Sequence, residues 1–218
     1  GLGLVLAKEA VQRGAKKVYA GMRNTDNFHE QGMIAVQIDV TDPESIQKAV
    51  AACGDVSILI NNAGIARLNQ SPVEAEIAAT TRKVLETNLY GMINSTQQFS
   101  PILSAQPESY IVNILSDVSW QPSTFLASYA ISKAAAWSFT NSTRQWFAKS
   151  NLHVMGVHVG FIDTDLTQTL EIEKVSPQVV AEHIFDGIER NAFEVVVGES
   201  SQQLKQGLTA PIPSYISL

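Results

Sequence analysis

Short apolar runs alternate with longer helical patterns along this 218-residue chain. The apolar runs have the length of strands, and capping residues or glycines bound the helical segments between them. Such alternation predicts a parallel sheet with helices on both faces, that is, a doubly wound α/β fold, and no linker or repeat divides residues 1–218, so we expect a single domain. The expected strands are 17–20, 33–38, 56–60, 109–116, 153–159 and 194–197, and the expected helices are 2–13, 81–99 and 126–149, with further helices beginning at Thr41 and Ser176.

Composition excludes several classes of function. With a net charge of −6 and scattered basic residues, the chain has no basic surface for nucleic acid or an anionic membrane. No apolar stretch approaches the roughly 20 residues that span a bilayer. The single cysteine, Cys53, suits a reducing compartment, so we expect a cytoplasmic protein. The histidines lack ligand spacing, and Asp163 and Asp165 are typical of a helix N-terminus, so we assign no metal.

Polar residues and glycines follow most of the expected strands. In doubly wound sheets, ligands bind beyond the carboxyl ends of the strands, where the strand order reverses. The residues at these positions are Arg23, Asp39, Asn62, Gly64, Ser116 and Gly160. Their common placement predicts a ligand site at that edge of the sheet.

Ser116, Tyr129 and Lys133 have the chemistry of a proton-transfer site. Tyr129 and Lys133 are four residues apart, so a helix places them on one face. A neighbouring ammonium favours phenolate, and we therefore expect the pKa of Tyr129 to lie well below its usual value of about 10. Ser116 ends a buried strand, where its hydroxyl could hold the same substrate oxygen. A Tyr–Lys pair at this spacing also occurs by chance, so its interpretation depends on the other parts of the site.

These residues and their surroundings resemble the short-chain dehydrogenase/reductase family over essentially the whole chain. The resemblance implies a Rossmann-like fold. Gly1, Leu2 and Gly3 match the last three positions of the family's glycine-rich turn, followed at once by a helix. The resemblance also implies that the family's first strand and the start of that turn are missing, that the chain is truncated at its N-terminus, and that this truncated chain is unstable or inactive.

The resemblance further implies a dinucleotide site. Asn62, Ala63 and Gly64 match the family's Asn-Ala-Gly motif, whose small residues let the backbone approach the cofactor. Arg23 stands near the position that selects the cofactor, and an arginine there accommodates a 2′-phosphate, which predicts NADP rather than NAD. The alternative for Arg23 is a solvated surface side chain. Asp39 and Val40 are expected beside the adenine, although Asp39 could instead form a plain turn. Ile162 and Thr164 are expected beside the carboxamide, and Tyr129 and Lys133 complete the expected cofactor residues.

The catalytic tetrad that the resemblance implies is Asn88, Ser116, Tyr129 and Lys133. The expected function is an NADP-dependent oxidoreductase that transfers a hydride between nicotinamide and a carbonyl or secondary alcohol, with Tyr129 as acid/base. The alternative is a non-catalytic dinucleotide-binding regulatory protein with the same fold.

The expected substrate pocket is mainly apolar. Its expected walls are Ile65, Trp120, Phe125, Phe161, Leu166 and Leu170, which favour a carbonyl or alcohol on a hydrophobic small molecule. Helices 81–99 and 126–149 form the intersubunit bundle of similar proteins. The aromatic residues of the second helix therefore favour a homodimer or homotetramer.

Overall fold

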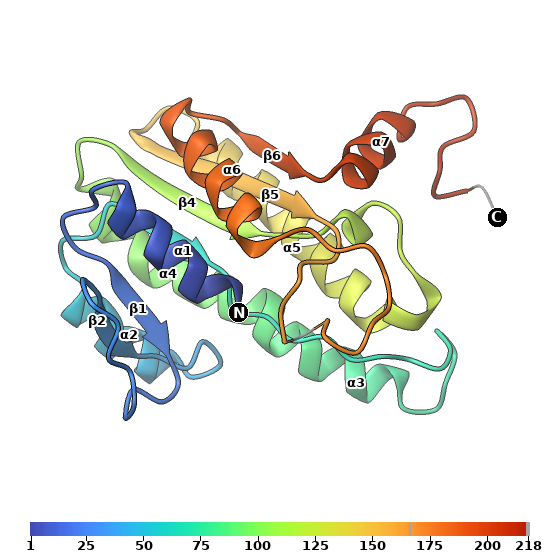
Figure 1. Ribbon diagram of the computed structural model, residues 1–218, viewed down its shortest axis with the longest axis horizontal. Coiled ribbons are helices and arrows are strands. Elements are labelled where there is room, and N and C mark those ends of the chain that lie inside the picture. Colours follow the sequence, from blue (N-terminus) through green and yellow to red (C-terminus); the bar gives the residue numbers. More distant parts are fainter. Residues whose placement is uncertain (166, 217–218) are drawn as a thin grey trace.

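A computed structural model describes residues 1–165 and 167–216. Strands and helices alternate as expected (Figure 1). The strands are β1 (Tyr19–Met22), β2 (Ile34–Gln37), β3 (Ile58–Asn61), β4 (Ser109–Ile114), β5 (Leu152–Val159) and β6 (Glu194–Val197). The helices are α1 (Leu2–Gln12), α2 (Pro43–Ala52), α3 (Ile77–Leu85), α4 (Gly91–Ser104), α5 (Ala127–Trp146), α6 (Pro177–Glu189) and α7 (Glu199–Gly207).

All strand pairs in the described residues are parallel, which confirms the predicted fold class. The strands form two sheets, one with the order β1-β2 and one with the order β3-β4-β5-β6. Within the described part of the chain, β1 and β3 share no ladder. Central strand β4 is buried at every position, as expected for a strand covered on both faces.

Two layers of helices cover the larger sheet. In Figure 1, α1 and α6 lie in front of it and α4 and α5 lie behind. The front layer shares a core with β4, β5 and β6 that includes Leu6, Val157 and Ile184. A second core joins α2 and α4 to β2 and β4 and includes Ile46 and Leu103. Because these cores fix the sheet between rigid helices, the carboxyl ends of the strands are held in place for a ligand.

The helices differ from the sequence expectation at several places, including the end of α5, which is Trp146 and not residue 149. Asp42, not Thr41, caps α2, with its carboxylate accepting from the Glu44 amide at 3.0 Å. The helix expected at 81–99 begins at Ile77 and contains a π-helical turn, Glu86–Tyr90. Helix α7 was not predicted, because its polar sequence has no apolar period from which a helix could be inferred.

Candidate active site

Ser116 and Tyr129 face one cavity at the carboxyl edge of the larger sheet. Ser116 follows β4, and Tyr129 lies in the first turn of α5. The other lining residues come from the segments after β3, β4 and β5. They are Ala66, Leu68, Ile114, Leu115, Asp117, Val118, Leu126, Val159, Gly160, Phe161, Ile162, Thr164, Thr167, Thr169 and Leu170. The cavity therefore combines a few polar groups, among them the hydroxyls of Ser116 and Tyr129, with mainly apolar walls, as expected for a small-molecule site.

The hydroxyl of Ser116 is held by its own turn. Ser116 is the N-cap of a short 3-10 helix, Asp117–Ser119, and its Oγ accepts from the Val118 amide at 3.4 Å. The same hydroxyl donates to Asp117 Oδ1 at 3.3 Å. Both contacts are long, so a substrate oxygen in the cavity can compete for this hydroxyl.

Lys133 lies one helical turn from Tyr129, but the expected effect on the phenol is wrong for this structure. The buried Lys133 ammonium donates to the Ile114 carbonyl at 2.6 Å and lies 5.6 Å from the centroid of the Tyr129 ring. Burial, and then the Asp117 carboxylate, raise the pKa of Tyr129 above its usual value, while Ser116 acts in the opposite direction. Burial also lowers the pKa of Lys133 to about 8. Desolvation disfavours the charged form of each group and is the largest cause of both changes.

Asn88 joins the site to the segment after β3. It is buried in the π-helical turn, and such turns frequently occur at functional sites. Its Oδ1 accepts from the Ile65 amide at 2.8 Å, and its Nδ2 donates to the Ile65 carbonyl at 2.9 Å and to Ser132 Oγ at 2.9 Å. Asn88 therefore fixes a loop beside the cavity to the helix that carries Tyr129 and Lys133.

Gly1, Leu2 and Gly3 form the start of α1, which has neither a side-chain cap nor an acid in its first turn. The first amides of a helix lack intrahelical acceptors and suit a phosphate. A Cβ on Gly3 would lie 2.9 Å from Asn62 Nδ2, so the absence of a side chain lets this end of α1 approach β3 closely. These residues fit the diphosphate of a dinucleotide.

Asn62, Ala63 and Gly64 follow β3 directly. A Cβ on Gly64 would lie 3.5 Å from Asn88 Oδ1, so this segment runs close to the tetrad residue. The two predicted groups, the Asn-Ala-Gly segment and the tetrad, are therefore neighbours in space.

Arg23 and Asp39 follow the neighbouring strands β1 and β2. Arg23 is exposed, and its charge contributes to lowering the pKa of Asp39, although the Thr41 hydroxyl and amide are the larger causes. Asp39 Oδ1 accepts from the Thr41 amide at 2.9 Å and from its hydroxyl at 2.7 Å, as the alternative of a plain turn requires. Val40 packs against Gly91, where a Cβ would approach Val40 Cγ2 to 2.7 Å.

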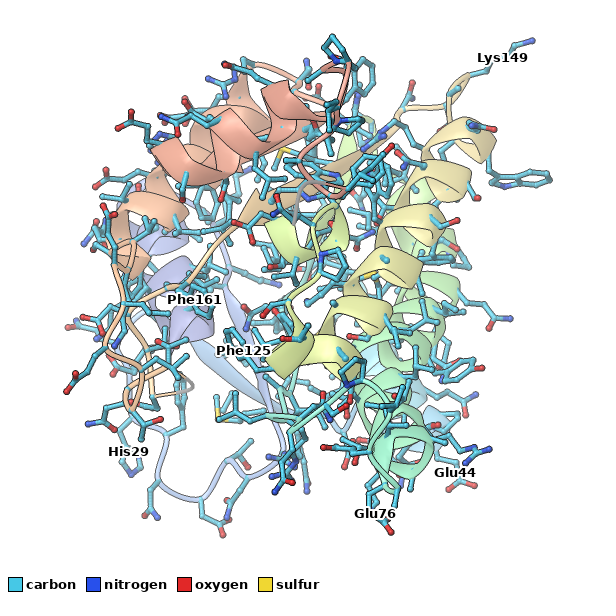
Figure 2. The ribbon with its side chains drawn as sticks, turned by 90° about the vertical axis from the view of Figure 1, so that its right-hand side faces the viewer. His29, Glu44, Glu76, Phe125, Lys149 and Phe161 are labelled. Atoms are coloured by element: carbon cyan, nitrogen blue, oxygen red, sulfur yellow. The ribbon has the colours of Figure 1, made fainter. Side chains whose placement is uncertain are left out.

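The expected pocket walls are partly wrong. Of the expected walls, Phe161 and Leu170 line the cavity, but Ile65, Trp120 and Phe125 do not; Ile162 and Thr164, expected beside the carboxamide, also line it. Trp120 is buried and stacks on His158 with ring centroids 3.8 Å apart. Phe125 is 44% exposed, and Figure 2 shows it on the same side of the molecule as Phe161. Leu166 lies outside the described residues.

Sequence reasoning missed Asp117 as a cavity residue. Its position directly after Ser116, at the same strand end, was the available signal.

In the described residues no group of three or more His, Cys, Asp or Glu side chains could hold a metal ion. No helix in residues 1–165 and 167–216 is both long and apolar enough to cross a membrane.

A family model described as short chain dehydrogenase matches residues 1–174. The 3-oxoacyl-(acyl-carrier-protein) reductase FabG of Vibrio cholerae is 30% identical over 183 residues, which cover 80% of this chain and 74% of that protein. The NADPH-dependent 1-acyldihydroxyacetone phosphate reductase of Schizosaccharomyces pombe is 30% identical over 173 residues, which cover 76% of this chain and 57% of that protein.

A solved structure also resembles the chain along almost its whole length. It is a short chain dehydrogenase from Burkholderia cenocepacia J2315 in complex with NADP, with a TM-score of 0.91 and 33% sequence identity. The match covers 97% of this chain and 89% of that one. The chain therefore belongs to the short-chain dehydrogenase/reductase family of oxidoreductases, which act on alcohol and carbonyl groups with NAD(P).

Proposed function

We propose that the protein is an NADP-dependent oxidoreductase acting on a carbonyl or secondary alcohol group of a mainly apolar small molecule. The observation that supports this best is the cavity itself. The Ser116 and Tyr129 side chains line it together, and its other walls are mostly apolar. Bound NADP would supply or accept the hydride at its nicotinamide ring.

The side chains divide the remaining work. In the direction of reduction, Tyr129 donates its hydroxyl proton to the substrate oxygen, and Ser116 donates a hydrogen bond to the same oxygen. The raised pKa of Tyr129 keeps the phenol protonated, which is the form that can donate. The Lys133 ammonium, one helical turn from the phenol, stabilises the phenolate left after the transfer, and Asn88 holds the Ile65 segment against the helix that carries both residues.

NADP is favoured over NAD by two observations. The Burkholderia structure is a complex with NADP, and the Schizosaccharomyces relative is named for its use of NADPH. Arg23 is exposed after β1, where a guanidinium can pair with a 2′-phosphate.

Arg23→Ala should raise the KM for NADPH about tenfold or more and leave the KM for NADH within about twofold. Equal weakening of both cofactors would count against the choice of NADP.

The proposal is tested by turnover of a panel of carbonyl compounds and alcohols with NADPH/NADP and NADH/NAD. Tyr129→Phe should lower kcat by about 10² or more and leave cofactor affinity nearly unchanged, since it removes only the transferable proton. Tyr215→Phe is a matched control, because Tyr215 is 53% exposed and outside the cavity, and it should leave kcat unchanged.

The alternative, a non-catalytic dinucleotide-binding regulatory protein, predicts a different result. It requires that the cofactor binds but that no carbonyl or alcohol is turned over. Residual turnover that Tyr129→Phe leaves unchanged would also remove Tyr129 from the mechanism.

We further propose a cytoplasmic homodimer or homotetramer. The single cysteine, Cys53, is buried and free, which suits a reducing compartment. Exposed apolar side chains lie on the two helical segments expected to pack between subunits, 81–99 and 126–149. They are Tyr90, Ile131 and Trp146. Trp137, Phe139 and Phe147 instead pack at least partly against the core. A monomeric mass by light scattering at micromolar concentration would refute the assembly.

A further inference from the structure

Asp117 is a carboxylate in an otherwise uncharged cavity wall. It follows Ser116 and lines the same cavity as Ser116 and Tyr129. Among the lining residues that the structure describes, no other carboxylate and no Lys, Arg or His side chain occurs. No step of the proposed reaction uses this charge.

The Asp117 carboxylate is fixed from three sides. Oδ1 accepts from the Ser116 hydroxyl at 3.3 Å, and Oδ2 accepts from the hydroxyl of Ser201, on α7, at 2.7 Å. Ser201 is fully buried, so α7 anchors the carboxylate against the sheet edge. A Cβ on Gly160 would lie 3.0 Å from Oδ2, so the carboxylate also packs closely on the turn after β5. A charge held in this way cannot turn away from a bound ligand.

The negative charge of Asp117 acts on the Tyr129 phenol, which lines the same cavity. After burial, Asp117 is the next cause that raises the pKa of Tyr129, so its field acts on the phenol. The acidic segment 163–174 lines the cavity through Thr164, Thr167 and Leu170. Its four carboxylates, Asp163, Asp165, Glu171 and Glu173, are exposed, so water screens them and the field in the cavity comes mainly from Asp117.

The cationic side chains near the cavity are paired elsewhere or exposed to solvent. Lys133 hydrogen-bonds the Ile114 carbonyl and does not line the cavity. Arg67 is exposed between the lining residues Ala66 and Leu68. Lys174 Nζ lies 4.0 Å from Asp163 Oδ1, on the acidic segment itself.

We propose that Asp117 is a specificity-determining residue: its carboxylate excludes substrates that would bring a carboxylate or phosphate into the cavity, and it favours neutral or cationic carbonyl compounds and alcohols. The proposal rests on the proposed function, because the cavity is taken to be where the substrate binds. Like charges in a partly dry site repel strongly, whereas a carboxylate accepts hydrogen bonds from hydroxyl, amide or ammonium groups.

The test compares two ligands of nearly equal shape, 4-acetylbenzamide and 4-acetylbenzoate. Their affinities for the full chain saturated with oxidised NADP are measured by calorimetry, so that no turnover is needed. The unaltered protein should bind the amide at least about tenfold more tightly than the carboxylate. Asp117→Asn, which keeps the shape and removes the charge, should reduce this preference to below about threefold.

A control separates the charge of Asp117 from charges nearby. Asp163→Asn removes a carboxylate that is 71% exposed and screened by water, so it should retain the tenfold preference within about a factor of two.

Equal binding of the two ligands to the unaltered protein would overturn the proposal, as would a preference that survives in Asp117→Asn. If Asp117→Asn fails to fold, the preference of the unaltered protein still decides. Absence of binding by both ligands would also overturn it, whereas failure of the proposed function would appear as turnover unaffected by Tyr129→Phe.

Discussion

Replacing Lys133 with methionine should stabilise the folded chain while abolishing its activity. The ammonium is 4% exposed and makes one hydrogen bond, to the Ile114 carbonyl. Burial lowers its pKa from 10.5 to about 8. At about 1.4 kcal/mol per pKa unit, this difference corresponds to about 3 kcal/mol by which the buried charge destabilises the fold at neutral pH. The Ile114 carbonyl would lose its hydrogen-bond donor, which costs about 1 kcal/mol of stability. The free energy of unfolding of Lys133→Met should therefore be about 2 kcal/mol higher than that of the unaltered protein, and its Tm about 4–8 °C higher.

The pH dependence follows from the same pKa values. Below pH 8 both the folded and the unfolded chain carry the proton on Lys133, and the full penalty is present. Between pH 8 and 10.5 the folded chain has lost the proton while the unfolded chain still holds it, so the stability of the unaltered protein rises with pH. The advantage of Lys133→Met should therefore be largest at pH 7 and shrink toward pH 10.5.

Urea unfolding at pH 7, 8.5 and 10 measures this difference without cofactor. Lys149→Met is the matched control, since Figure 2 shows Lys149 pointing into solvent beyond the end of α5, and it should change stability by less than about 0.5 kcal/mol. The reasoning is refuted if Lys133→Met is no more stable than the unaltered protein at pH 7, or if its advantage is independent of pH.

Two further substitutions test how the site is held. Asn88→Ala should destabilise the chain by about 2–4 kcal/mol in urea unfolding, because the amide and the carbonyl of Ile65 lose their hydrogen-bond partners. A loss of stability below about 1 kcal/mol would show that water replaces these hydrogen bonds. Gly91→Ala should destabilise the chain by about 1–3 kcal/mol, because the new methyl group would meet Val40 at 2.7 Å. Gly54→Ala is the control: a Cβ there has nothing within 4 Å, so the change should be within about 0.5 kcal/mol of neutral. Equal effects of the two substitutions would contradict the packing argument.

The positions of most site residues could be predicted because they depend on topology alone. Parallel strands end at one edge, so Ser116 after β4 and Ile162 after β5 meet at one cavity although the chain separates them widely. The i, i+4 spacing likewise placed Tyr129 and Lys133 on one face of α5. Both arguments need only the period of an element and the direction of a strand.

Packing details could not be predicted in the same way. Trp120 was expected in the pocket wall, yet it stacks on His158 from β5, a contact between residues far apart in the sequence. Thr41 had the spacing of a helix cap, but its amide and hydroxyl bind Asp39 instead, and Asp42 caps the helix. Several side chains could satisfy each of these groups, and only the assembled fold selects one.

The pKa of Tyr129 shows why proximity alone is insufficient for predicting chemistry. The argument from sequence counted one favourable charge, Lys133, and left out the dielectric around it and any opposing charge. In the fold, burial raises the pKa of Tyr129 and also lowers the pKa of Lys133, the cation that the sequence argument relied on to stabilise phenolate. Asp117 then adds a negative charge that directly follows Ser116 in the chain. In this setting the phenol stays protonated, so the balance of burial and charge around Tyr129, and not its distance from Lys133 alone, decides in which form it would meet a substrate oxygen.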